Sequence, residues 1–284
     1  MVTKKNIDKL VNFINQGVKD NLGDRLESIY LVGSYTKGKI SLSRPDINWL
    51  LVHKEPVQDE SRWELGQVLT DAIDVFINDF VVRPEPRPFK FSYPIRRGMD
   101  EVFVNMSIVS SATSSDEFKT KNNFIPEYVL EGYKQTRKLV FGKDILENID
   151  FKVSREIIHR DAVEKIISHK VQLDRIPLAY HLDRDIDLIF NESLSHGKNL
   201  LYFGVELLMS EEELKEKKFL EIFDNKDNFL EFYKKRLPKT INSVQKILEA
   251  KEHYSEWKSN KERAREIYLI ASNFSNILFG LINE

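Results

Sequence analysis

The sequence predicts an α/β domain with a mixed sheet, followed by an all-α helical domain. Short apolar runs typical of buried strands alternate with amphipathic helical segments up to about residue 150. After about residue 152 the strand patterns disappear and long helical patterns take their place. We therefore expect one domain over residues 1–150 and a helical domain over residues 151–284.

The composition is that of an ordinary globular protein. Of 284 residues, 41% are hydrophobic and 31% are charged, and the formal net charge is -2. Such a balance gives no global basic field to attract nucleic acid. The absence of cysteine excludes disulfides and thiolate metal sites. Met1 to Lys9 shows no apolar signal core, and no run approaches the ~18 apolar residues of a membrane helix. We expect a cytoplasmic protein without a membrane partner.

The elements of the first half follow from local patterns. Apolar residues at helical spacing predict a helix over 5–22, which ends near Gly23. Residues 27–32 and 47–53 are predicted as buried strands, and residues 58–80 as a second amphipathic helix. The runs 89–95 and 101–109 are expected to form a hairpin. Residues 123–141 are expected to be helical, with a stop at Gly142.

Long helical segments fill the second half. They are predicted over 154–174, 179–194, 198–209, 227–251 and 260–282. Pro177, Pro238 and the turn-like Ser195-His-Gly197 are expected to separate them. The apolar surface of these helices is sufficient for a homodimer.

One stretch near the N-terminus carries residues suited to chemistry. An apolar run, residues 28–32, leads into Gly33-Ser34, and Asp46-Ile-Asn48 opens the apolar run 49–52. A glycine turn lets backbone approach a phosphate closely, because glycine has no side chain. Alternation along a strand directs Asp46 and Asn48 to the same side. Mg²⁺ prefers hard oxygen ligands, so one or two such side chains together with phosphate oxygens can bind it.

This pattern resembles the DNA polymerase beta-like nucleotidyltransferase superfamily, in which an apolar residue and Gly-Ser precede an Asp-x-Asp pair that opens a strand. The helical second half is similar in outline to that of members that modify antibiotics and other small molecules. The resemblance implies transfer of a nucleoside monophosphate from a nucleoside triphosphate to a hydroxyl group. The acceptor is expected to be a small molecule rather than nucleic acid.

The resemblance also implies roles for single residues. Gly33, Ser34 and Lys37 would bind the nucleotide, and Asp46 and Asn48 would hold Mg²⁺. The family has a third acid on a later strand, which here corresponds to Asn105, with Glu101 or Asp100 at the strand entrance as alternatives. The expected catalytic set is therefore Asp46, Asn48 and Asn105. For Lys37, a solvated loop lysine is an equally good interpretation.

Two of the three acidic positions hold amides, and this departure opens a second hypothesis. An amide carbonyl can bind a cation but carries no charge, so Mg²⁺ binding should be weakened. Asparagine also cannot serve as a general base. The alternative is a catalytically lapsed member that binds a nucleotide or a protein, and a third idea is a partner of a separate helical ribonuclease. Five residues are candidates for a basic rim that pairs with polyphosphate, and basic side chains that flank a hairpin without a binding role are the alternative: Arg83, Arg87, Lys90, Arg96 and Arg97.

Overall fold

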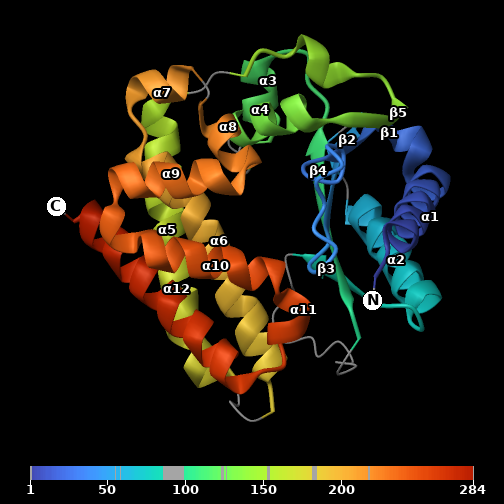
Figure 1. Ribbon diagram of the computed structural model, residues 1–284. Coiled ribbons are helices and arrows are strands. Elements are labelled where there is room, and N and C mark those ends of the chain that lie inside the picture. The colour runs from blue at the N-terminus through green and yellow to red at the C-terminus, as the bar shows by residue number, and fades with distance from the viewer. Residues whose placement is uncertain are drawn as a thin grey trace. The chain divides into compact units, whose positions relative to one another are not determined.

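The computed structural model describes the chain except for Met1, Glu55, Gln58, residues 86–98, residues 123, 124 and 126, residues 152 and 153, residues 181–183, residue 217 and Glu284. The chain forms two compact units, Met1–Lys152 and Val153–Glu284. The first unit is built around a sheet and the second consists of helices (Figure 1). The predicted fold class, an α/β domain with a mixed sheet and an all-α domain, is confirmed.

The sheet of the first unit has the strand order β3-β4-β2-β1-β5. Its strands are β1 (Leu26–Val32), β2 (Asp46–His53), β3 (Val81–Glu85), β4 (Glu101–Ser110) and β5 (Lys138–Gly142). β1 runs antiparallel to β2 and β5, whereas β4 runs parallel to β2 and β3. The central strands β1 and β2 are buried along almost their whole length, as expected when both faces are covered.

Helices cover both faces of this sheet (Figure 1). On one face lie α1 (Lys4–Leu22) and α2 (Asp59–Phe76), whose apolar side chains form one core with Leu31, Trp49 and Leu51. The other face carries α3 (Ser115–Lys121), α4 (Glu127–Thr136) and the 3-10 helix η2 (Ile145–Asn148), which pack over Val32 and Leu50. Alternate residues of β2 therefore belong to different cores.

The N-terminal helix follows from its sequence. Thr3 and Asn6 form a reciprocal capping box at the start of α1, which satisfies backbone donors that would otherwise lack partners. The apolar stripe of α1 is buried against the sheet, and the Trp49 Nε1–H donates to Asn15 Oδ1 at 2.8 Å. The short 3-10 helix η1 (Gly23–Arg25) connects α1 to β1.

Two predicted elements of the first unit differ from the structure. The helix expected over 123–141 is α4, which ends at Thr136, and the chain then forms β5. Gly142 has a positive φ of 80°, and a Cβ there would lie 1.9 Å from the Glu27 carbonyl oxygen, so the close approach of β5 to β1 requires glycine. The neighbour of β4 on its outer side is the parallel strand β3. The first arm of the expected hairpin, residues 89–95, lies outside the described residues.

The second unit is a bundle centred on three long helices. These are α5 (Arg155–Ala179), α6 (Ile186–Leu208) and α12 (Lys261–Ile282). Shorter elements complete it: α7 (Glu211–Lys215), α8 (Lys218–Asp224), α9 (Lys226–Arg236), η3 (Pro238–Thr240), α10 (Ile241–Glu252) and α11 (Tyr254–Trp257).

Two predicted breaks in this bundle do not exist. The sequence Ser195-His-Gly197 is not a turn but lies inside α6, where a Cβ on Gly197 would meet the Ala271 side chain at 3.2 Å. The small residue therefore allows α6 and α12 to approach closely. Pro177 lies within the last turn of α5, and the helix continues past it to Ala179. Pro238, in contrast, does separate α9 from α10.

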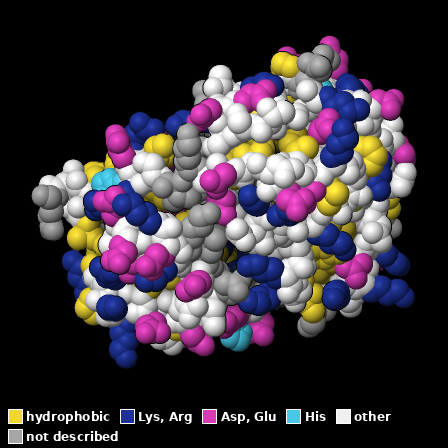
Figure 2. Space-filling model, turned by 90° about the horizontal axis from the view of Figure 1, so that it is seen from above, with side chains coloured by type: hydrophobic (Ala, Val, Ile, Leu, Met, Phe, Trp, Pro, Cys, Tyr) yellow, Lys and Arg dark blue, Asp and Glu magenta, His cyan; other side chains and the backbone are white. Residues whose placement is uncertain are grey.

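The surface carries both signs of charge. On the face shown in Figure 2, Lys and Arg side chains are interspersed with Asp and Glu side chains, in agreement with the net charge of -2. Among the described residues, no helix combines the length and the apolar character needed to cross a membrane.

Candidate functional site

The Gly-Ser turn and the Asp-x-Asn pair meet at one rim of the sheet. β1 ends at Val32, which is the register partner of Asn48 in the antiparallel pair with β2. The chain therefore leaves the sheet at Gly33 on the same rim at which β2 begins with Asp46. Thus the two halves of the sequence motif, separated by a loop, come together through strand pairing.

Gly33 occupies a position that only glycine fills without strain. Its φ is 84°, which lies in the left-handed region. A Cβ at this position would lie 3.4 Å from Asn48 Nδ2, which is a tight contact. The backbone of Gly33 therefore packs directly against the side chain that replaces the second acid of the motif.

The loop that follows is fastened to the C-terminal end of α4. The Gly33 N–H donates to Thr136 Oγ1 at 3.0 Å. The Thr36 hydroxyl has two carbonyl acceptors, Gly33 O at 2.7 Å and Thr136 O at 2.6 Å. In this conformation the Gly33 amide is thus engaged by Thr136 and not exposed for a phosphate. Local sequence patterns gave no signal for Thr136, which lies about a hundred residues further along the chain.

The other predicted nucleotide-binding residues lie further along the same loop. Ser34 and Lys37 are exposed, and the loop closes on itself through the Lys39 N–H, which donates to Ser34 O at 2.9 Å. The Tyr35 side chain leaves the loop towards α1, where its hydroxyl donates to Asp8 Oδ1 at 2.7 Å. Burial, reinforced by the negative Asp8, raises the pKa of Tyr35 far above its ordinary value.

The three predicted catalytic residues share one face of the sheet. In the parallel pair of β2 and β4, Asp46 is the register partner of Phe103, and Asn48 is the register partner of Asn105. Asp46, Asn48 and Asn105 are each half-buried. They lie on the face covered by α4, since Ile47 and Trp49 belong to the core on the opposite face.

A partly buried tyrosine of α4, Tyr133, packs on this face of the sheet. Burial is the largest influence on Tyr133 and raises its pKa, a hydrogen bond with Ser107 opposes this, and the negative charge of Asp46 raises it further. The phenol therefore stays protonated and lies close to both Ser107 and Asp46. Its hydrogen-bond partner beside the rim is Ser107.

The alternatives for the third acid are committed to other contacts. Glu101 is buried and forms an ion pair with the buried Arg83. Asp100 accepts a hydrogen bond from the Val2 backbone N–H at 2.7 Å. Arg83 is therefore not part of a basic rim, contrary to the prediction. The other four residues expected there, Arg87, Lys90, Arg96 and Arg97, lie outside the described residues.

The Arg44 guanidinium lies against β4 beside the rim. Arg44 is 1% exposed and stacks on the Phe103 ring, with its Cζ 3.9 Å from the ring centroid. Phe103 is the partner of Asp46 in the sheet, and its N–H donates to Pro45 O at 2.8 Å. These contacts hold the segment that leads into Asp46.

The donor set at the rim fits a hard cation only weakly. One carboxylate, Asp46, and the two amides of Asn48 and Asn105 offer oxygen ligands of the kind that Mg²⁺ accepts. In the part of the chain that the structure describes, no three His, Cys, Asp or Glu side chains converge on a point where they could hold a metal ion. Mg²⁺ would therefore need phosphate oxygens to complete its coordination.

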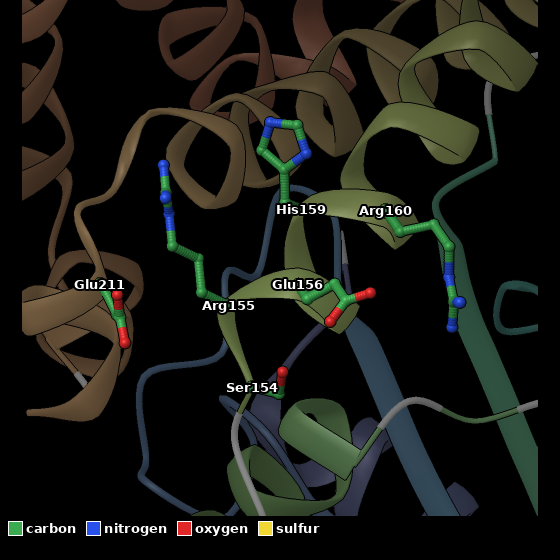
Figure 3. A pocket seen from close by; sticks show the side chains of 6 residues that line it. All are labelled: Ser154, Arg155, Glu156, His159, Arg160 and Glu211. Atoms are coloured by element: carbon green, nitrogen blue, oxygen red, sulfur yellow. The ribbon is translucent and has the colours of Figure 1, made fainter.

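The second unit has a hollow of its own at the start of α5 (Figure 3). It measures about 620 Å³ and is lined by six residues: Ser154, Arg155, Glu156, His159, Arg160 and Glu211. The side chains of Arg155 and Arg160 point in different directions from α5, and the carboxylates of Glu156 and Glu211 also line the hollow (Figure 3). The mixed charges define no single ligand class.

Comparison with solved structures supports the fold. The chain is similar to the crystal structure of spectinomycin adenyltransferase AAD(9) from Enterococcus faecialis, solved with ATP and spectinomycin. The TM-score is 0.51 and the identity is 15%, over 95% of this chain and 98% of the other. No family model and no curated protein matches the sequence. The class defined by this likeness is the nucleotidyltransferase-like fold with a helical C-terminal region.

Proposed function

We propose that the first unit binds a nucleoside triphosphate at the rim formed by Gly33, Asp46 and Asn48 and transfers its nucleoside monophosphate to a hydroxyl of a small molecule. The observation that carries this proposal is the meeting of the Gly-Ser turn with Asp46 at one sheet rim, within a fold similar to that of an adenyltransferase. That protein was solved with ATP and a small antibiotic, and this favours a small acceptor here.

The transfer is an in-line displacement. The acceptor oxygen forms a bond to the α-phosphorus, the bond between the α-phosphorus and the bridging oxygen breaks, and pyrophosphate leaves with that electron pair. Bound Mg²⁺ would supply neutralisation of the phosphate charge. Asp46 would hold the Mg²⁺ ion through its carboxylate, while Asn48 and Asn105 would contribute neutral amide oxygens. Since neither amide can accept the acceptor's proton, that proton passes to water or to the leaving group.

The neutral pair also favours a second candidate, a protein that binds a nucleotide without chemistry. Asn48 and Asn105 are register partners, so the two amides that stand in place of the motif's acids lie at the same level of the rim. One missing charge at ~4 Å from a cation corresponds to about 4 kcal/mol at an effective dielectric of about 20, before desolvation is subtracted. Such a loss is large enough to weaken the metal site sharply.

A pyrophosphate-release assay separates the two candidates. Wild type, Asp46→Ala and the double variant Asn48→Asp/Asn105→Asp are incubated with Mg²⁺, each nucleoside triphosphate and a panel of aminocyclitol antibiotics that includes spectinomycin. Release by the wild type that disappears in Asp46→Ala supports transfer. Release by the double variant alone supports a lapsed enzyme. Equal release by wild type and Asp46→Ala would refute the assignment of the rim as the site.

A further inference from the structure

The first unit contains a second polar hollow, between α1 and the edge of the sheet. It measures about 410 Å³, which lies within the usual range for small-molecule sites. Its lining includes six polar side chains from α1, the loop after β1, and β5: Asn12, Asn15, Gln16, Lys19, Tyr35 and Lys138. The apolar remainder is Val11, Leu31 and Val140.

This hollow lies on the opposite face of the sheet from the rim site. Leu31 and its register partner Lys138 both line it, and Leu31 belongs to the core beneath α1 and α2. Asp46 and Asn48 are on the face covered by α4, because the intervening Ile47 and Trp49 belong to the α1 core. A ligand here would therefore not occupy the proposed nucleotide site.

Two lysines give the hollow a net positive charge. Lys19 projects from the last turn of α1 and lies 6.0 Å from the centroid of the Phe141 ring. Lys138 is exposed at the start of β5. Neither lysine forms an ion pair with a carboxylate of the described residues, whereas the Nζ of Lys143, the residue directly after β5, lies 3.7 Å from Glu27 Oε1. Two ammonium groups at one opening favour a ligand with two negative charges.

Amide groups of α1 line the same hollow with directional donors and acceptors. Asn15 is 9% exposed, and its Oδ1 accepts the Trp49 indole N–H at 2.8 Å, which fixes the orientation of the amide. Its NH₂ group makes no hydrogen bond to another described residue. Asn12 lies one helical turn before Gln16, whose amide donates to Asp20 at 2.7 Å. Amides that both donate and accept are suited to hydroxyl groups.

We propose that this hollow binds a small phosphate monoester that carries hydroxyl groups, of the sugar-phosphate class. The phosphate dianion pairs with Lys19 and Lys138, and the hydroxyls exchange hydrogen bonds with Asn12 and Asn15. The Tyr35 ring lines the hollow and belongs to the loop that starts at Gly33. A sugar phosphate bound in this hollow therefore contacts, through Tyr35, the same loop that borders the rim site on the opposite face of the sheet.

Isothermal titration calorimetry on the full chain tests the proposal with three probes: glucose 6-phosphate, inorganic phosphate and glucose. We expect glucose 6-phosphate to bind with Kd below about 1 mM, inorganic phosphate to bind more weakly, and glucose not to bind. In Lys19→Gln/Lys138→Gln the Kd should rise at least about tenfold, because both charges are lost. Asn12→Ala should raise the Kd for glucose 6-phosphate but leave the Kd for inorganic phosphate unchanged.

The controls are Lys143→Gln, which removes a lysine that directly follows β5 and lies outside the hollow, and Asp46→Ala, which alters the rim. Neither variant should change the affinity for glucose 6-phosphate. The outcome of this experiment is therefore independent of whether the rim binds a nucleotide. Thermal unfolding of each variant verifies that it is folded. Absence of binding to wild type, an unchanged Kd in the double lysine variant, or equal affinities for phosphate and glucose 6-phosphate would overturn the proposal.

Discussion

Asn48 and Asn105 are register partners on the parallel strands β2 and β4, on the sheet face that also carries Asp46. A cation at this rim would meet one carboxylate and two neutral amides. The rim therefore combines a single negative charge with two neutral side chains among these three residues, and the consequences for a bound cation can be measured.

Introducing carboxylates at this pair should strengthen metal binding. We expect Asn48→Asp/Asn105→Asp to lower the Kd for Mg²⁺, measured by calorimetry with a non-hydrolysable ATP analogue, by at least about tenfold. Without metal the same variant should be less stable than wild type, since two carboxylates at one level repel. Gln67→Glu, at an exposed position of α2 over the opposite face of the sheet, adds one charge away from the rim and should leave the Mg²⁺ affinity unchanged. Unaltered Mg²⁺ affinity in the double variant would argue against this rim as a metal site.

A side chain at Gly33 should strain the start of the loop. Gly33→Ala imposes a left-handed residue, at a cost of about 1–2 kcal/mol, and brings the new methyl group to Asn48. Urea unfolding should show this loss. The matched control is Gly66→Ala in α2, where a Cβ meets nothing within 4 Å and alanine should stabilise the helix by about 0.5–1 kcal/mol. Equal effects at both positions would contradict the role assigned to Gly33.

Removal of the Thr136 hydroxyl should release the loop from α4. Thr136→Val deletes the acceptor of the Gly33 N–H, so exchange of the Gly33 amide hydrogen should accelerate and stability should fall by about 1 kcal/mol. Thr120→Val is the control, because its hydroxyl bonds only within α3. If Gly33 exchanges at the same rate in Thr136→Val and wild type, the fastening of the loop depends on other contacts.

The second unit should lose stability in mild acid. His169 on α5 and His196 on α6 approach each other with Nδ1 atoms 2.8 Å apart, which requires at least one neutral ring. Burial, then the charge of His196 and that of Lys165, holds the pKa of His169 well below its ordinary value. Burial also lowers the pKa of His196, against the opposing influence of Glu192.

Because both imidazoles have lowered pKa values in the folded state, the unfolded chain binds more protons below about pH 6.5. Their contribution to stability is complete above that pH and declines as the pH falls towards the folded-state pKa. Chemical unfolding between pH 7 and pH 5 should therefore show declining stability, with a smaller decline in His169→Gln. The exposed His253→Gln is the control. A pH dependence that is identical in His169→Gln and wild type would refute this assignment.

The sequence allowed prediction of the fold class because its periodic patterns are long. It failed at Lys138–Gly142, a short edge strand with no fully buried residue, since such a strand produces no clear alternation. It also failed at Gly197, where a residue typical of turns instead permits close packing of two helices. Tertiary contacts decide both cases.

The rim site was predictable only in part, for a similar reason. Alternation along one strand indicates that Asp46 and Asn48 share a face, but the level at which Asn48 meets Asn105 depends on the register of strands far apart in the chain. The hydrogen bond from Gly33 to Thr136 depends on the position of α4, about a hundred residues later, and no local pattern encodes it.

Calorimetry with ATP and Mg²⁺ tests the central claim most directly, namely that the sheet rim at Gly33 and Asp46 receives a nucleoside triphosphate. Wild type should bind one of the four nucleoside triphosphates at millimolar concentration or below, and Asp46→Ala should weaken that binding at least about tenfold. No binding of any of the four to wild type, or binding of equal strength to Asp46→Ala, would contradict it.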